Sequence, residues 1–383
     1  MKLTEHNWEE TFSIIQISFH TLISICLFFL FQEFQVKKYM AFILTFFIGF
    51  NPSLIYYSTY LLADHLLAVL TTLSWIFTIR FSKNFHKRKK NYIDLIFIGI
   101  FSGLAIVTKP IAILAIFPIV LSIILTNGIS YKMVRYIIVL FIINFSFHLL
   151  WEKYKEYNNP ALKFELIDHT EFSINMIAIR AGLIDYGQGT PLYDHLVERN
   201  LLETAKKFNI QLSYTMDTDP DFREFYNSLS WSIKNDKKFA IKIIQNAPIK
   251  LFVAAISNWH AFFTKRCFSP RDGSFPYMPE IIRYIYNVSY ELLYRPLLAI
   301  LLISSFIILW KKKFLTLLYS SGGLILYASL TIAILTPHGG EFPRYRVWVE
   351  YIIFFCALFP IGIFMEFYSR KLYTLVGKLI LKS

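Results

Sequence analysis

The sequence predicts an all-α polytopic membrane protein, a bundle of about nine transmembrane helices with a mainly helical extracytoplasmic loop domain. Composition, the length of the apolar runs and the placement of basic residues support this fold class. Of 383 residues, 55% are hydrophobic and 17% are charged, with a mean hydropathy of +0.47. So few charged residues cannot cover a water-facing surface. The apolar runs approach about 20 residues, the length at which an α-helix crosses the hydrocarbon core.

Each apolar run predicts one transmembrane span. In chain order the spans cover residues 11–32, 39–57, 61–79, 92–108, 111–126, 133–151, 289–310, 314–335 and 347–368. Six spans form an N-terminal bundle, residues 1–151, and three form a C-terminal bundle with a tail, residues 289–383. Residues 152–288 are mixed polar and charged, with turn signals and helical periodicity, so we expect an extracytoplasmic soluble or interfacial region there.

Basic residues are sorted between alternate connections. They gather in the connections around residues 37–38, 80–90, 132–135, 311–313 and 370–382. The opposite short connections hold only Lys2, Lys109, Arg344 and Arg346. An excess of Lys and Arg marks the cytoplasmic side of a membrane protein. We therefore expect a multi-pass protein of the cell (inner) membrane, with a cytoplasmic C-terminus, a periplasmic or extracellular large loop, and no nucleic acid partner despite the net charge of +13.

Asp64 and His65 stand at the outer start of the third span, after a segment with Pro52 and several hydroxyl-bearing residues. A carboxylate at a helix N-terminus is favoured by the helix dipole, so Asp64 is a helix cap in one interpretation. In the other it is a catalytic or substrate-orienting carboxylate, because ionisable groups at the membrane boundary are costly and usually functional. Both interpretations fit the sequence.

Lys109 and Pro110 alone separate the fourth and fifth spans. Proline cannot continue a helical hydrogen-bond ladder and restricts the residue before it, so the chain can reverse direction there. A lysine at such a turn can extend toward lipid headgroups. Facing a cavity instead, its ammonium group suits a phosphate ligand.

Arg344 and Arg346 open the last span, after a compact outer segment at residues 336–343. Arginine offers planar paired donors that match phosphate, and the positive-inside bias disfavours it on this face unless a ligand recruits it. Extension toward headgroups is the alternative.

The aspartates at residues 217–221 resemble the start of a calcium loop, but the required Gly and Glu are missing, so a solvated acidic turn and no metal site are expected.

Taken together, these positions resemble the GT-C superfamily of polyprenyl-phosphate-sugar-dependent glycosyltransferases, which contains the protein O-mannosyltransferases and the aminoarabinose transferases of lipid A. Four motifs match in order and spacing. They are Asn51-Pro52 with Tyr56-Tyr57-Ser58 and Asp64, then Gly103-Leu104-Ala105 with Thr108-Lys109, then Gln245-Asn246-Ala247-Pro248, and finally Arg344-Tyr345-Arg346.

The resemblance implies a membrane enzyme that moves a hexosyl or pentosyl group from a polyprenyl-phosphate donor to an extracytoplasmic lipid, glycan or protein acceptor, without a cofactor or metal. Asp64 would be catalytic, and Lys109, Arg344 and Arg346 would bind the donor phosphate. The substrate would be lined by Tyr57, His65, His338, Glu341 and Tyr345. Family members begin with a span and an external loop that carries an acidic residue. This sequence begins where that loop would end, so we expect both to be missing and the activity of the chain alone to be in question.

Two other functions place many spans beside a large outer loop, namely a surface-polysaccharide polymerase or ligase and a non-catalytic transporter or flippase of lipid-linked sugars. A transporter would place charges and broken helices near the membrane midplane. A ligase would concentrate its arginines in the large loop. Here the candidate charges stand at the outer edge of the spans, which favours the glycosyltransferase.

Overall fold

A computed structural model describes most of the chain. The described residues are 8–51, 54–55, 58, 63–85, 92–158, 166–207, 220–257, 259–264, 280, 284, 297–335 and 342–380. They form helices and connections, with no strand among them. The chain divides into two compact units. The first comprises residues 1–151, 268–326 and 347–383, and the second comprises residues 152–267 and 327–346.

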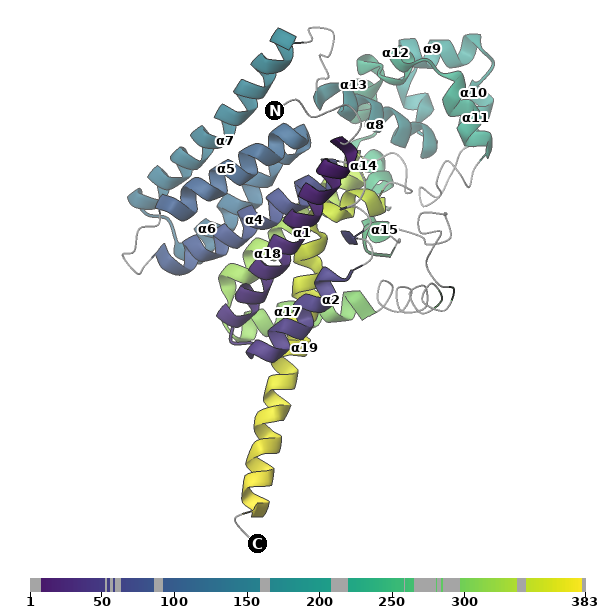
Figure 1. Cartoon of the computed structure of the whole chain (residues 1–383). Helices are drawn as coiled ribbons and strands as arrows, with labels where there is room; N and C mark the ends of the chain where they lie inside the picture. Colours follow the sequence, from purple (N-terminus) through teal and green to yellow (C-terminus); the bar gives the residue numbers. More distant parts are fainter. Residues whose placement is uncertain are drawn as a thin grey trace. The chain divides into compact units, whose positions relative to one another are not determined.

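Five helices in the described part of the chain are long and apolar enough to cross a membrane. They belong to α1 (Trp8–Glu33), α4 (Ala63–Asn84), α7 (Tyr131–Asn158), α18 (Leu315–Leu335) and α19 (Phe342–Ile380) (Figure 1). The other four predicted spans coincide with shorter apolar helices, namely α2 (Lys38–Gly49), α5 (Tyr92–Thr108), α6 (Ile116–Asn127) with the preceding 3-10 helix η2 (Pro110–Ala115), and α17 (Leu298–Lys311). The prediction of an all-α polytopic membrane protein is confirmed.

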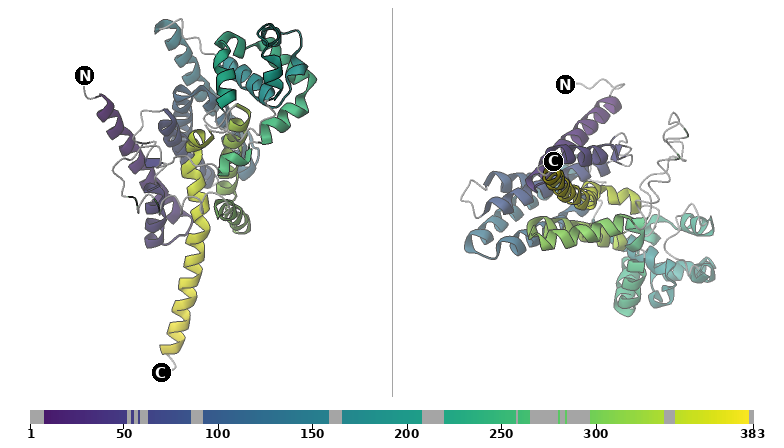
Figure 2. Two further views of the ribbon diagram at one scale, coloured as in Figure 1. Left: turned by 90° about the vertical axis from the view of Figure 1, so that its right-hand side faces the viewer. Right: turned by 90° about the horizontal axis from the view of Figure 1, so that it is seen from below.

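Several helices differ in length from the predicted spans, and two of the differences have a bearing on the site. Helix α2 ends at Gly49, well before residue 57, and Asn51 is no longer helical. Asn51 precedes Pro52, and a residue before proline is pushed out of the helical region. In contrast, α19 contains Pro360 and still continues past the predicted end at residue 368. Figure 2 shows it as one uninterrupted helix. At 39 residues it is about 58 Å long, longer than the hydrocarbon core is thick.

The connections that are rich in basic residues meet at one end of the first unit. Lys83, near the end of α4, lies 4.4 Å from the ring centroid of Phe34, just after α1. Phe34 also packs edge-on against Phe314, which follows α17. Lys132, at the start of α7, lies 5.4 Å from the ring of Phe85, which follows α4. The structure therefore gathers these connections on one side, and the assignment of that side to the cytoplasm stays a prediction.

Close packing of α5 against α7 depends on two glycines. A Cβ atom on Gly99 would lie 2.7 Å from Ile143, and one on Gly103 would lie 2.4 Å from Phe147. Between the glycines, the Ser102 hydroxyl is hydrogen-bonded by the Asn144 amide inside the bundle. Membrane helices associate through such small residues and polar contacts, because lipid removes the hydrophobic driving force between them. The glycine of the Gly103-Leu104-Ala105 motif thus has a packing role.

We expect Gly103→Ala to lower the free energy of unfolding by about 1–3 kcal/mol, because the new methyl group overpacks the contact with Phe147. Gly322→Ala is the matched control, since its methyl group would meet only the tip of the Phe306 ring, at 4.0 Å. There the better helix propensity of alanine leaves stability unchanged or slightly higher. Thermal unfolding in detergent measures both variants. Equal melting temperatures would contradict the packing role of Gly103.

The second unit is a helical domain with its own apolar core. Its helices are α8 (Leu166–Arg180), η3 (Ile184–Gly187), α9 (Pro191–Glu198), α10 (Leu202–Lys207), α11 (Pro220–Ser228), α12 (Trp231–Lys234), α13 (Lys237–Asn246), α14 (Pro248–Ser257) and α15 (Trp259–Thr264). The amphipathic faces of α8, α9 and α13 bury Met176, Leu192 and Phe239. The bend of 100° between α13 and α14 falls where proline interrupts the helical ladder.

Asp236 ties three helices of the second unit together. Its carboxylate caps α13 by accepting a hydrogen bond from the backbone N–H of Lys238, at 2.9 Å. The same carboxylate accepts one from the N–H of Leu192 in the first turn of α9, at 2.8 Å. The Asn175 amide of α8 donates to the backbone carbonyl of Asp236, at 3.0 Å. One buried residue thus fixes the junction of α8, α9 and α13.

We expect Asp236→Ala to destabilise the protein by about 2–3 kcal/mol, because α13 loses its cap and the N–H of Leu192 is left buried without an acceptor. Asp194→Ala, at an exposed position in the first turn of α9, is expected to change stability by no more than about 0.5 kcal/mol. Denaturant unfolding of the full chain compares the two. A loss as small as that of the control would show that Asp236 does not hold the junction.

Candidate functional site

A buried charged cluster lies at the end of the first unit opposite the basic connections. Asp64, the second residue of α4, is 0% exposed. Its Oδ1 atom forms an ion pair with the Nζ atom of Lys109 and accepts a hydrogen bond from the indole N–H of Trp348, at 3.0 Å. The Nζ atom of Lys109 also lies 5.2 Å from the centroid of the Trp348 ring. Segments that are far apart in the sequence therefore meet at one carboxylate oxygen.

The turn at Lys109 results from the proline that follows it. Lys109 has an extended backbone, with φ −147° and ψ 120°, as expected for a residue before proline. Its N–H donates to the carbonyl of Ala105 at the end of α5, and its own carbonyl accepts from Ala112 in η2. Helix η2 then packs back against α5. Lys109 thus occupies the turn, where its side chain reaches the start of α4.

Within this cluster the carboxylate of Asp64 is buried, whereas the ammonium group of Lys109 stays partly accessible. A fully buried carboxylate is stable only with compensating charges and hydrogen bonds. Lys109, Trp348 and the N-terminal end of the α4 dipole supply them for Asp64. The side chain of Lys109 is 20% exposed, whereas that of Asp64 is not exposed. An ammonium group has three donors, so Lys109 is suited to contact an incoming anion while it stays paired with Asp64.

A second polar cluster begins at the next residue of α4. The Nε2 atom of His65 lies 3.1 Å from the hydroxyl oxygen of Tyr351 in α19. That oxygen lies 2.5 Å from the Nδ1 atom of His20 in α1, and the Nε2 atom of His20 lies 2.8 Å from the carbonyl oxygen of Gly49 in α2. His20, His65 and Tyr351 are all buried. These contacts link four helices of the first unit through one line of polar groups.

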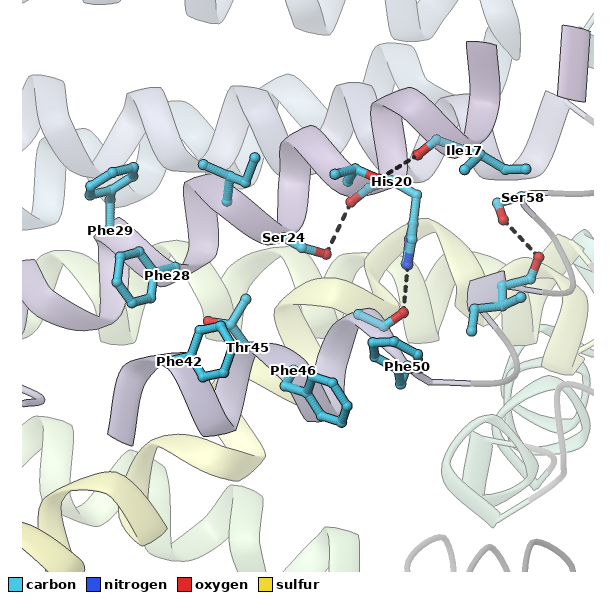
Figure 3. A pocket seen from close by; sticks show the side chains of 14 residues that line it. Ile17, His20, Ser24, Phe28, Phe29, Phe42, Thr45, Phe46, Phe50 and Ser58 are labelled. Atoms are coloured by element: carbon cyan, nitrogen blue, oxygen red, sulfur yellow. Dashed lines mark hydrogen bonds between the residues drawn. The ribbon is translucent and has the colours of Figure 1, made fainter. Parts of the chain in front are cut away.

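His20 forms part of the wall of a pocket of about 670 Å³. The pocket is lined mainly by aromatic and aliphatic side chains of α1 and α2, among them Phe28 and Phe46. Figure 3 shows the His20 ring pointing toward the backbone carbonyl that it contacts, beside Phe50. Two serines and two threonines add hydroxyl groups to a mainly apolar wall, namely Ser24, Ser58, Thr21 and Thr45. The line of polar groups therefore ends at a cavity.

Sequence reasoning missed Trp348, Tyr351 and His20. Each lies inside an apolar run, where an aromatic or a single histidine resembles an ordinary core residue. The available signal was a histidine within a predicted span, because polar residues inside the membrane are usually functional. Trp348 and Tyr351 are three residues apart on α19, so one helix face presents both.

The other predicted site residues are placed as follows. Arg346 belongs to the second unit, where it is fully buried and donates from Nη1 to the carbonyl oxygen of Phe262 in α15, at 2.7 Å. For Arg344 and Tyr345 the structure describes the backbone, in the first turn of α19. The remaining candidates lie outside the described residues, namely Tyr57, His338 and Glu341. Within the described ranges, no group of three His, Cys, Asp or Glu side chains is arranged to hold a metal ion.

Residues 9–155 match the family model of dolichyl-phosphate-mannose-protein mannosyltransferases, which is a GT-C family domain. This segment runs from α1 to α7 and contains Asp64, Lys109, His65 and His20. No curated protein and no solved structure matches the chain. The match supports the GT-C resemblance for the part of the chain that holds most of the candidate site.

Proposed function

We propose that the chain is a membrane glycosyltransferase that moves a sugar from a polyprenyl-phosphate donor to an extracytoplasmic acceptor. One observation carries this proposal. The partly accessible ammonium group of Lys109, held by the buried Asp64, lies within the segment that matches a family named for a sugar on a polyprenyl phosphate. A cation at a helix end suits a lipid phosphate at the membrane boundary, because ammonium groups bind phosphate and ionisable residues at this depth are usually functional.

The chemistry of the transfer assigns a task to Lys109. The bond between the anomeric carbon and the phosphate oxygen breaks, and the phosphate leaves with the electron pair while the acceptor oxygen bonds to the sugar. Negative charge therefore grows on the phosphate, and preorganised cations lower the barrier by stabilising that charge. We propose that Lys109 contacts the phosphate, together with Arg344 and Arg346 as the resemblance implies.

For Asp64 the contacts favour a positioning role. Its Oδ1 atom already accepts from Lys109 and from Trp348, and a carboxylate engaged in this way is a weaker base. We propose that Asp64 holds Lys109 at the turn after α5. Activation of the acceptor hydroxyl by Asp64 stays a prediction from the sequence.

The placement of charges favours this function over the alternatives. Among the described residues of the first unit, the ion pairs Lys83–Glu33 and Lys109–Asp64 join residues near helix ends. A transport path would place charges close to the midplane. A polysaccharide polymerase or ligase uses the same class of donor and differs in its acceptor, so it is the second candidate. Identification of the product that carries the transferred sugar separates the two.

We expect Lys109→Met to abolish transfer of radiolabelled mannose from polyprenyl-phosphate mannose and also to destabilise the protein. Removing one partner of a buried ion pair costs about 3–5 kcal/mol, because the other charge is left uncompensated. The double variant Asp64→Asn/Lys109→Met removes both charges and is expected to recover most of the stability. Its transfer activity should stay lost, because no ammonium group remains for the phosphate.

Lys83→Met is the matched control, since Lys83 pairs with Glu33 at the opposite end of the bundle. We expect it to retain transfer and to lose less than about 1 kcal/mol, as exposed ion pairs contribute little. Thermal unfolding and the transfer assay are measured on the same membrane preparations. Activity restored together with stability in the double variant would show that the Asp64–Lys109 pair is purely structural.

Arg344→Ala is expected to reduce transfer by about 100-fold or more, because a phosphate-binding donor in a low-dielectric site is worth several kcal/mol in the transition state. Arg344→Lys should retain part of the activity, since it keeps the charge and loses the paired donors. The melting temperature should be unchanged in both variants. Wild-type turnover in Arg344→Ala would exclude this arginine from the phosphate site.

A further inference from the structure

The hydrogen bonds that join Gly49, His20, Tyr351 and His65 have defined donors and acceptors. A carbonyl oxygen can only accept, so the Nε2 atom of His20 must carry a hydrogen and donate it to Gly49. In a neutral His20 the Nδ1 atom is then an acceptor, and the Tyr351 hydroxyl donates to it. The Tyr351 oxygen in turn accepts the N–H of the His65 Nε2 atom. Each hydrogen bond therefore sets the donor and acceptor roles in the next.

The consequence is a bare acceptor nitrogen at His65. With the hydrogen on Nε2, the Nδ1 atom of a neutral His65 carries only a lone pair. This atom is buried and has no hydrogen-bond partner among the residues that the structure describes, and His65 itself is 0% exposed. A buried polar atom without a partner costs about 1–3 kcal/mol. The atom belongs to the residue directly after Asp64, beside the pair that we assign to the donor phosphate.

We propose that the Nδ1 atom of His65 takes the proton of the acceptor hydroxyl and that Tyr351 and His20 relay the charge away from it. This inference rests on the proposed glycosyl transfer and deepens it. His65 is the catalytic residue in this proposal, because it contacts the reacting hydroxyl. Tyr351 and His20 are positioning residues that act through it.

The relay balances in protons and electrons. As the acceptor O–H bond breaks, an N–H bond forms at Nδ1 of His65 and the Nε2 hydrogen of His65 moves to the Tyr351 oxygen. The hydroxyl hydrogen of Tyr351 moves to Nδ1 of His20, which becomes an imidazolium with hydrogens on both nitrogens. The electron pair of the O–H bond forms the new glycosidic bond, and the phosphate leaves with the pair of the old one. No oxidant or reductant takes part.

The two ends of the line suit these roles. His65 is enclosed, whereas His20 lies in the wall of the pocket between α1 and α2, so the charge moves from the interior to a cavity surface (Figure 3). Asp64, the residue directly before His65, has its Oδ1 atom engaged by an ammonium and an indole N–H. His65 therefore offers the less compensated acceptor of the two neighbouring residues.

Nitrogen NMR of the full-length protein labelled with ¹⁵N-histidine tests the direction of the line without any substrate. We expect the His65 ring to be the Nε2–H tautomer in the wild type, with the signal assigned by its loss in His65→Gln. In Tyr351→Phe, which removes only a hydroxyl group, His65 should become a mixture of tautomers. A wild-type His65 with hydrogen on Nδ1 would overturn the relay and leave the proposed glycosyl transfer untouched.

Transfer from radiolabelled polyprenyl-phosphate mannose to the acceptors of native membranes tests the proton step. His65→Gln and Tyr351→Phe should each lower kcat by about 100-fold or more, the usual effect of losing general base catalysis, with the KM for the donor unchanged. Tyr136→Phe, at a buried tyrosine near the opposite end of the bundle, should retain wild-type turnover. Wild-type turnover in Tyr351→Phe would refute the relay. If Lys109→Met then still loses activity, the proposed glycosyl transfer stands without the relay. Absence of transfer in the wild type would overturn both proposals.

Discussion

The charge on Asp64 is the constraint around which the first unit is organised. A carboxylate that is completely removed from water must find its counter-charge and hydrogen bonds within the protein. Lys109 and Trp348 supply them from the turn after α5 and from α19, and so one oxygen atom fixes the relative position of three segments. The next residue, His65, repeats the pattern with Tyr351 of the same α19 face. Two consecutive residues of α4 therefore determine the register of α19.

The two units are held together by different kinds of contact. In the first, apolar side chains gain little from contact with each other, and the helices are joined by small residues and polar pairs such as the Ser102–Asn144 hydrogen bond. In the second, short amphipathic helices bury an ordinary apolar core around Phe239, and Asp236 satisfies the backbone donors where helices meet. The same chain thus uses polar contacts to associate helices in the first unit and to cap helices in the second.

The sequence predicts the helical membrane fold because span length and charge sorting are physical requirements of a bilayer. Asp64 and Lys109 are also recognisable individually, as ionisable residues at the edges of apolar runs. The resemblance implies that both serve one site, but their direct ion pair is not predictable, because nothing local indicates that the turn after α5 reaches the start of α4. Trp348 and His20 are hidden for another reason. An aromatic or histidine side chain in an apolar helix can pack in the core or form a hydrogen bond. Which of the two it does depends on the register of the helix, which only the assembled bundle determines. The end of α2 at Gly49 is consistent with the nearby Pro52. A prediction from span length alone disregards this local signal and extends the helix too far.

The Asp64–Lys109 pair also has a consequence for charge balance. The pair is electrically neutral, so a sugar phosphodiester with one negative charge brings the site to a net charge of −1. When the sugar departs, the phosphate gains a second negative charge, and the site reaches −2 unless a proton or cation joins it. A single lysine that already neutralises a carboxylate leaves this second charge unmatched. The charge balance therefore gives a reason for the arginines that we propose beside Lys109, because their guanidinium groups would supply the positive charge that the departing phosphate needs.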